Sequence, residues 1–193
     1  MEKTIWPVII EYADRFDPDP GHAREVCRLS ALLFQALGEL HTYEKKERDI
    51  LKSAALLHDI GWSRPQIAHH KASRDIILAD RTIPFSDRER KMVSLIARYH
   101  RKTGPKPDHA VFRDLDGADQ QIVIFCSGIL RIADGLDRAH QNAVFDLTCT
   151  IGDDELIISI TCRHPSLIDM AVFSEKSQLL ETTINRRISL ICT

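Results

Sequence analysis

Two residues of metal-binding type, His58 and Asp59, close a helical stretch of small and apolar side chains, Ala54 to Leu57. An isolated His-Asp pair is weak evidence, because such dipeptides often arise by chance. The pair gains meaning because His22 precedes it in another helical pattern and Asp134 follows it in a third. Imidazole and carboxylate groups without a thiolate suit Mn, Fe, Zn, Co or Mg. These four residues therefore predict a site for a divalent metal ion.

Each of these residues stands in line with apolar side chains at helical spacing, the pattern of a face that points inward. His22 is followed at i+4, i+7 and i+11 by Val26, Leu29 and Leu33. Asp134 ends the series Val123, Ser127 and Leu130, and His58 follows Leu51 and Ala55 on one face. Asp59 lies about 100° round the helix from His58, so both reach inward only where another helix closes over them. A fourth helical pattern has Val93 and Ile96 on its apolar face and likewise ends at a possible ligand, His100.

Each residue taken alone also has an ordinary explanation. A single inward-facing histidine is more often a hydrogen-bonded core residue than a metal ligand. Asp134 can form a simple helix ion pair with Arg138 at i+4. Asp137 can be an acid or base beside the metal, or only a carboxylate at the end of a helix. The coincidence of four residues in this order and context favours the metal site.

The order His…His-Asp…Asp resembles that of the HD superfamily of metal-dependent phosphohydrolases. The resemblance implies hydrolysis of a phosphate ester or anhydride, with His58, Asp59 and Asp137 as catalytic residues. A divalent ion suits this chemistry because it neutralises phosphoryl oxygens and lowers the pKa of a bound water from 15.7 to about 7.

Some members of the HD superfamily bind two metal ions, so the resemblance implies that a second ion could bind beside the first. His70 and His100 would hold it, with Asp59 bridging the two ions. His69 is the less favoured alternative to its neighbour His70. The chain is therefore expected to bind one or two divalent ions.

Basic residues surround the proposed ligands, and cationic side chains suit phosphate oxygens. The best candidates lie within four residues of a proposed ligand: Lys71, Arg101, Lys102 and Arg138. The alternative for any one of them is an ordinary position on a solvated helix face.

The composition indicates one globular protein with no global attraction to anionic partners. The chain has 193 residues, 44% hydrophobic and 28% charged, with a net charge of −2. This balance argues against a nucleic-acid or membrane partner, and no apolar run reaches the roughly 18 residues of a membrane helix. The five cysteines form no Cys-x-x-Cys pair, which favours reduced thiols in a cytoplasmic protein. The sequence leaves open whether the chain forms a homo-oligomer.

The elements that must position these residues follow from the periodicity of the sequence. Helices are predicted near residues 4–16, from 22 onward, and at 44–60, 69–80, 86–100 and 120–140. Thr4 is expected to cap the first helix, and Ser86 to Glu89 match a capping box. Gly61 is expected to end the third helix, with a positive φ allowed. The segment 102–119 is either a lid or a mobile surface loop.

The period changes near residue 142. Stretches rich in β-branched residues at 144–151 and 156–162 flank a hairpin signal, and a helix at 166–180 and a strand at 186–192 follow. The predicted fold class is mainly α. It has an HD-type helical bundle over residues 1–141 and a small C-terminal α+β (β-β-α-β) subdomain over residues 142–193.

A closer resemblance covers nearly the whole chain. The motifs that carry it are Ala54 to Gly61, His69-His70-Lys71-Ala72-Ser73, Phe85 to Arg90, Ala97 to Lys102 and Leu130 to His140. In this order they resemble the C-terminal region of the exopolyphosphatase/guanosine pentaphosphatase (Ppx/GppA) family. In that family, hydrolysis is attributed to N-terminal actin-like domains, which this sequence lacks. The resemblance therefore implies the metal site and a basic surface, but not exopolyphosphatase chemistry itself.

Three functions are compatible with these observations. The first is a stand-alone phosphohydrolase acting on a nucleotide or other small phosphorylated metabolite. The second is a non-catalytic regulatory module that binds polyphosphate or a guanosine polyphosphate. The third and weakest is a nucleic-acid module that uses the basic segment 98–106.

Overall fold

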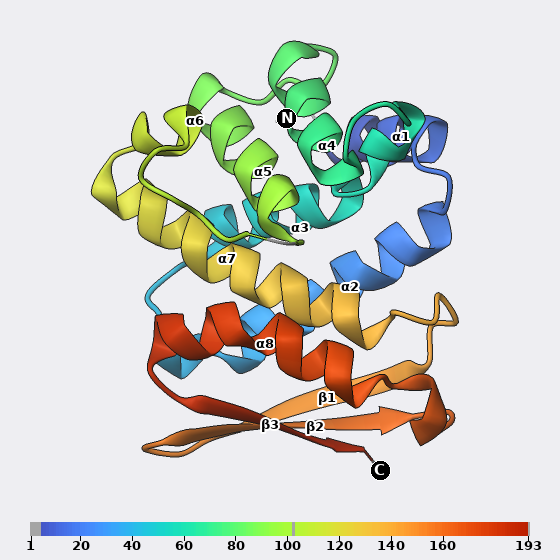
Figure 1. Cartoon of the computed structure of the whole chain (residues 1–193), viewed down its shortest axis with the longest axis vertical. Helices are drawn as coiled ribbons and strands as arrows, with labels where there is room; N and C mark the ends of the chain where they lie inside the picture. Colours follow the sequence, from blue (N-terminus) through green and yellow to red (C-terminus); the bar gives the residue numbers. More distant parts are fainter. Residues whose placement is uncertain (1–4, 102, 193) are drawn as a thin grey trace.

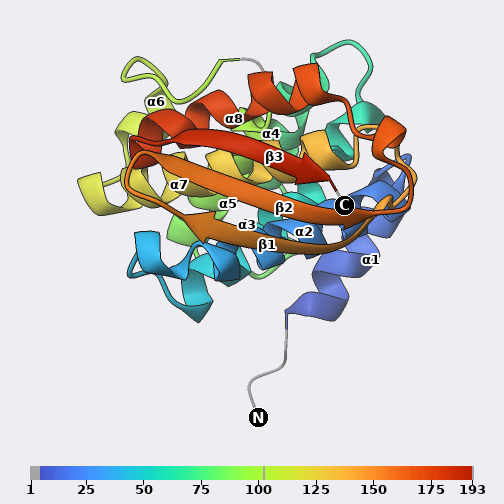
Figure 2. The same cartoon turned by 90° about the horizontal axis from the view of Figure 1, so that it is seen from below.

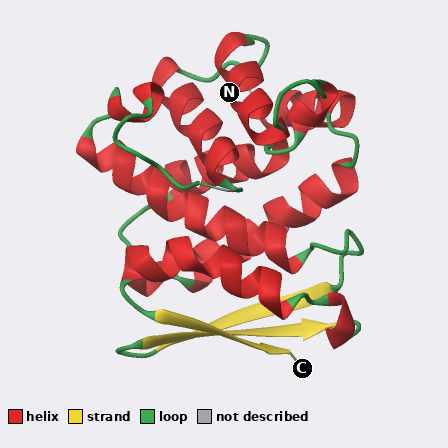
Figure 3. Cartoon of the chain, viewed as in Figure 1, coloured by secondary structure: helices red, strands yellow, loops and turns green. Residues whose placement is uncertain are grey.

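The computed structural model describes residues 5–101 and 103–192, so Thr4 and Lys102 lie outside the described residues. A body of helices rests on one small sheet (Figures 1 and 3). The α-helices are α1 (Trp6–Phe16), α2 (Pro20–Ala36), α3 (Lys45–Leu57), α4 (His69–Ala79), α5 (Asp87–Tyr99), α6 (Ala110–Arg113), α7 (Gly117–Leu136) and α8 (Met170–Ile184). The 3₁₀ helices are η1 (Gly38–Leu40), η2 (Ile60–Ser63) and η3 (Pro165–Leu167), and the strands are β1 (Val144–Ile151), β2 (Glu155–Cys162) and β3 (Arg187–Cys192).

Side-chain caps fix where the helices that carry the proposed ligands begin. Asp19 accepts a hydrogen bond from the backbone N–H of His22 at 3.1 Å and so starts α2. Ser86 and Glu89 form the predicted capping box of α5: Ser86 Oγ accepts from the Glu89 N–H, and the Glu89 carboxylate accepts from the Ser86 N–H. Such caps satisfy backbone donors that have no partner within the helix.

The sheet forms a separate layer below the helices, seen from underneath in Figure 2. Its order is β1-β2-β3, with β1 antiparallel to β2 and β2 parallel to β3. The crossover that makes the second pair parallel runs through α8, which also packs along α7. Leu156, Ile158 and Ile160 of β2 are buried beneath the helices.

The predicted fold class is confirmed: the chain is mainly helical and ends in a small β-β-α-β part. The division into two domains near residue 142 stays a prediction. None of the helices within the described residues has the length and apolar character needed to cross a membrane.

Two helices end earlier than the periodicity predicted. The helix expected to reach residue 60 ends at Leu57, and Asp59 leads into η2. The helix expected to reach residue 140 ends at Leu136, because the backbone of Asp137 leaves the helical region and His140 has a φ of 54°. Apolar periodicity does not register these turns, since the first residues beyond them, His58 and Asp137, are still buried.

Gly61 has a different role from the one expected, because its φ is not positive. A Cβ at this position would lie 2.0 Å from the carbonyl oxygen of His69 and 2.5 Å from the backbone nitrogen of Ser73. Ser73 Oγ donates to the carbonyl of His58 at 2.6 Å and accepts from the N–H of Gly61 at 2.9 Å. Glycine is required here because the turn after α3 lies directly against the first turns of α4.

We expect Gly61→Ala to lower the free energy of unfolding by about 3 kcal/mol, the upper end of the penalty for overpacking, because backbone atoms must move. Urea denaturation measures the change. Gly38→Ala is the matched control, because nothing lies within 4 Å of a Cβ at Gly38. Equal stability of the two variants would show that the turn after α3 is free to shift away from α4.

Candidate metal centre

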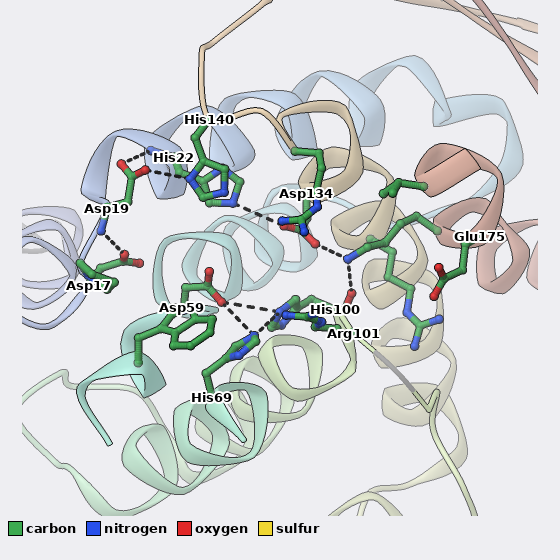
Figure 4. A pocket seen from close by; sticks show the side chains of 16 residues that line it. Asp17, Asp19, His22, Asp59, His69, His100, Arg101, Asp134, His140 and Glu175 are labelled. Carbon is green, nitrogen blue, oxygen red and sulfur yellow. Dashed lines mark hydrogen bonds and ion pairs between the residues drawn. The ribbon is translucent and has the colours of Figure 1, made fainter. Parts of the chain in front are cut away.

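A cavity of about 580 Å³ opens where the predicted ligands converge. Its walls come from the α1–α2 loop, the turn after α3, the start of α4, the end of α5, the end of α7 and α8. Figure 4 shows Asp17 and Asp19 beside His22 on one side, and Arg101 and Glu175 on the other. Segments distant in the sequence therefore bring acidic, basic and imidazole groups to one place.

Two histidines at helix ends direct the same ring nitrogen, Nε2, toward Asp59, at 3.7 Å for His58 and 3.6 Å for His100. His58 ends α3 and its Nδ1 donates to the carbonyl of Ala55 at 2.8 Å. His100 ends α5 and its Nδ1 donates to the carbonyl of Ala97 at 2.6 Å. A donor role for Nδ1 leaves the lone pair on Nε2, which is the state that binds a metal. Both imidazoles are thus held in the tautomer of a ligand.

His22 is held in the same way, but by a carboxylate. Its Nδ1 lies 2.8 Å from Oδ2 of Asp137, and its Nε2 lies 3.4 Å from Oδ1 of Asp134. Asp137 is itself buried and its Oδ1 accepts from the backbone N–H of Asn142 at 2.9 Å. Asp137, predicted to be catalytic, therefore sits behind His22 and orients that ring.

The donor atoms fall into two groups that could each hold a metal ion. In each group the ligand atoms lie within 4.8 Å of one another: His22, His58 and Asp134 form the first, and His58, Asp59 and His100 form the second. Within the described residues, the buried atoms His58 Nε2 and Asp59 Oδ1 make no hydrogen bond. Buried polar atoms without a partner are costly. A divalent cation would satisfy both, so the donor set fits such an ion.

The electrostatics of the cluster follow from burial and from neighbouring charges. Burial lowers the pKa of His100 to about 3, so its imidazole is neutral at pH 7. Burial also disfavours the charged form of His22, but hydrogen bonds with Asp134 and Asp137 outweigh this and raise its pKa to about 10. Burial would raise the pKa of Asp134, yet His22 and Lys176 hold it well below its ordinary value. The protonated His22 thus supplies positive charge where a cation would otherwise do so.

Lys176 of α8 brings a second positive charge to Asp134. Its ammonium donates to Oδ2 of Asp134 and, at 3.1 Å, to the carbonyl of His100. The other carboxylate oxygen, Oδ1, faces His22 and His58 at 3.4 Å and 3.9 Å. Lys176 therefore leaves one oxygen of Asp134 directed at the histidines.

The structure differs from the sequence-based expectation at the His69-His70 pair. His69 lines the cavity, with its Nε2 3.4 Å from Asp59 Oδ1 and 3.3 Å from His100 Nε2. His70 points instead into a separate pocket that Lys71 and Arg98 also line. Of the two histidines, His69 therefore has the contacts with Asp59 and His100. Which of them would complete a second metal site stays a prediction.

The basic residues predicted to bind phosphate do not all lie at the same cavity. Arg101 and Arg138 line the cavity, whereas Lys71 lies in the other pocket and Lys102 lies outside the described residues. Apolar periodicity found His22, His58 and Asp134 because these residues continue a buried stripe.

Several lining residues were not predicted as part of the site. They are Asp17, Asp19, Trp62, Arg131, His140, Glu175 and Lys176. Asp17 carries a signal of its own in the structure, since its buried Oδ2 makes no hydrogen bond among the described residues. Lys176 gave no signal in the sequence, because its place depends on how α8 packs. His140 stacks on His22 at a centroid distance of 3.9 Å, but it lies beyond Leu136, where α7 ends, so the helical periodicity did not place it there.

Comparison with family models identifies the class of protein to which this fold and cavity belong. The model described as Ppx/GppA phosphatase, domain III, matches residues 8–181. The chain therefore belongs to the Ppx/GppA phosphatase family and corresponds to its domain III. No curated protein matches the chain.

Asp137→Asn should weaken binding of a divalent ion about 10- to 100-fold, because the partner that orients His22 is altered while the ligands remain. Titration calorimetry with Mn²⁺ measures the affinity. His58→Ala should weaken binding further, and the exposed His164→Ala should leave it unchanged. Saturable binding of equal strength in all three variants would place the ion elsewhere.

Lys176→Met should lower the stability of metal-free protein by about 3 kcal/mol, because it removes one of the two positive charges that face a mostly buried carboxylate and leaves only His22. Saturating Mn²⁺ should reduce this loss, since the ion would supply the missing positive charge. Thermal and urea denaturation with and without the ion measure both effects. Lys45→Met, at an exposed position of α3, is the matched control. A loss independent of the ion would mean that the ion does not bind beside Asp134.

Proposed function

We propose that the chain is a cytoplasmic, metal-dependent phosphohydrolase of the HD type. Its substrate would be a phosphate ester or anhydride of a nucleotide or another small phosphorylated metabolite. The observation that carries the proposal is the pair of buried ligand atoms without a hydrogen bond, His58 Nε2 and Asp59 Oδ1, of which Asp59 lines a cavity that arginines also line. Membership of a phosphatase family supports the same reaction class.

The residues divide between holding an ion and binding a phosphate. His22, His58, Asp59 and Asp134 would hold the first ion, and His69 and His100 would share a second with Asp59. A divalent ion bound there supplies charge that neutralises phosphoryl oxygens and acidifies an attacking water. His22, His58 and His100 contribute fixed rings, because their Nδ1 atoms are already engaged.

Arg101 and Arg138 would bind the phosphoryl oxygens of the substrate. Both line the cavity, and no ion pair joins either of them to a carboxylate within the described residues. A guanidinium group not already paired can present two parallel N–H donors to a phosphate. Lys176 is committed to Asp134 and so acts as a positioning residue for a proposed metal ligand.

A second candidate function is binding without turnover. The matched family model describes one domain of a phosphatase, and a cavity with these cations would bind a phosphorylated ligand whether or not hydrolysis follows. Such a module would bind polyphosphate or a guanosine polyphosphate and regulate another enzyme. Tight binding with no phosphate release under any divalent ion would favour this second function.

Asp59→Asn should lower the rate of phosphate release at least about 100-fold, because it removes the charge of a carboxylate facing three imidazoles at the proposed metal site. The assay measures phosphate released from a panel of nucleotides and sugar phosphates with Mn²⁺, Co²⁺ or Mg²⁺. Asp153→Asn in the β1–β2 hairpin is the matched control. Undiminished release by Asp59→Asn would exclude the metal-dependent mechanism.

A further inference from the structure

Trp62 is a large aromatic residue that the proposed chemistry does not use. It lines the cavity and its side chain is 49% exposed. Its position is fixed, because its backbone N–H donates to the carbonyl of Asp59 at 3.0 Å within the turn that Ser73 holds against α4. Indole rings contribute large contact areas when they are buried. A half-exposed indole on a fixed turn therefore offers a ready contact surface to a ligand.

One face of this indole is already covered. Trp62 stacks on His69 with a centroid distance of 4.3 Å and an interplanar angle of 15°. His69 continues toward the ligand cluster, with its ring centroid 5.4 Å from that of His100. The indole thus stacks directly on one proposed metal ligand, His69, and His100 is one ring further on. The exposed half of Trp62 is left for a further ring.

The charges of the cavity place the anionic part of a ligand near that stack. Arg101 follows His100 in the chain, and Figure 4 shows it beside His100. A phosphate held by Arg101 and the proposed ions would leave the rest of the ligand within the same cavity as Trp62. A planar group on that part of the ligand could then stack on the indole.

We propose that Trp62 is the platform on which the base of a nucleotide stacks, and hence the residue that selects nucleotides over phosphorylated compounds without an aromatic base. The inference rests on the proposed function in one respect: the phosphate of the same ligand would lie at the metal site. Every base has a flat face, so the platform accepts any base. A purine should bind more tightly than a pyrimidine, because it covers more of the indole.

Tryptophan fluorescence tests this proposal without any turnover. The chain has two tryptophans, and Trp6 lies on α1 beside Lys52, outside the residues that line this cavity. In a Trp6→Phe variant, Trp62 is the only indole. We expect AMP and GMP to quench its emission, and ribose 5-phosphate and inorganic phosphate to leave it nearly unchanged. The titrations are made in EDTA-treated protein and again with saturating Mg²⁺.

Substitution of the platform gives the matching affinity measurement. By calorimetry, Trp62→Ala should weaken binding of AMP and GMP roughly 5- to 150-fold, the loss expected when one base–aromatic stack is removed. Binding of ribose 5-phosphate should change less than twofold, and Trp62→Phe should fall between the parent and Trp62→Ala. Trp6→Phe is the matched control and should bind AMP and GMP as the parent does.

The outcomes separate this inference from the proposed hydrolase. Quenching by nucleotides without phosphate release under any ion would support base stacking on Trp62 and contradict the proposed hydrolase activity. The opposite result is phosphate release from nucleotides, together with equal losses of affinity for AMP and ribose 5-phosphate in Trp62→Ala. It would support the hydrolase activity and overturn base stacking on Trp62. Absence of quenching both with and without Mg²⁺ would also overturn it.

Discussion

A carboxylate buried in a protein is costly unless opposite charges and hydrogen bonds surround it, and Asp134 imposes this requirement on the whole cavity. Its two oxygens are contacted from three other parts of the chain. His22 comes from α2, His58 from the end of α3 and Lys176 from α8, while Asp134 itself stands near the end of α7. The helical body and the segment after β2 thus depend on each other through one side chain. Their packing is coupled to the charge balance of the site.

Helix ends explain how the imidazoles become rigid. At two places the chain carries alanine three residues before histidine, Ala55 before His58 and Ala97 before His100, and each helix stops at that histidine. The carbonyl oxygens of the last helical turn have no partner within the helix, so the ring can turn back and donate to one of them. One hydrogen bond then serves two purposes, because it satisfies a carbonyl and selects the tautomer of the imidazole.

Much of this arrangement could be predicted from the sequence, because an apolar stripe shows which face of a helix points inward. His22, His58 and Asp134 continue such stripes, and the structure brings a ligand atom of each within 4.8 Å of the others. The sequence favoured His70 over His69, yet it is His69 that contacts Asp59 and His100, because apolar periodicity does not tell which of two adjacent histidines at the start of a helix faces a given carboxylate. Lys176 could not be found either. Its position follows from the parallel pairing of β2 and β3, which directs α8 along α7, and no local pattern encodes that pairing.

The pairing of Asp134 with Lys176 has a consequence for synthesis on the ribosome. The two residues are 42 positions apart, so at 5–20 residues per second the lysine is added about 2–8 s after the aspartate. In that interval the end of α7 exists without its ammonium partner. Full charge balance at this end of the nascent chain is reached only when α8 has emerged and docked, which makes the helix between the parallel strands the last contributor to the site.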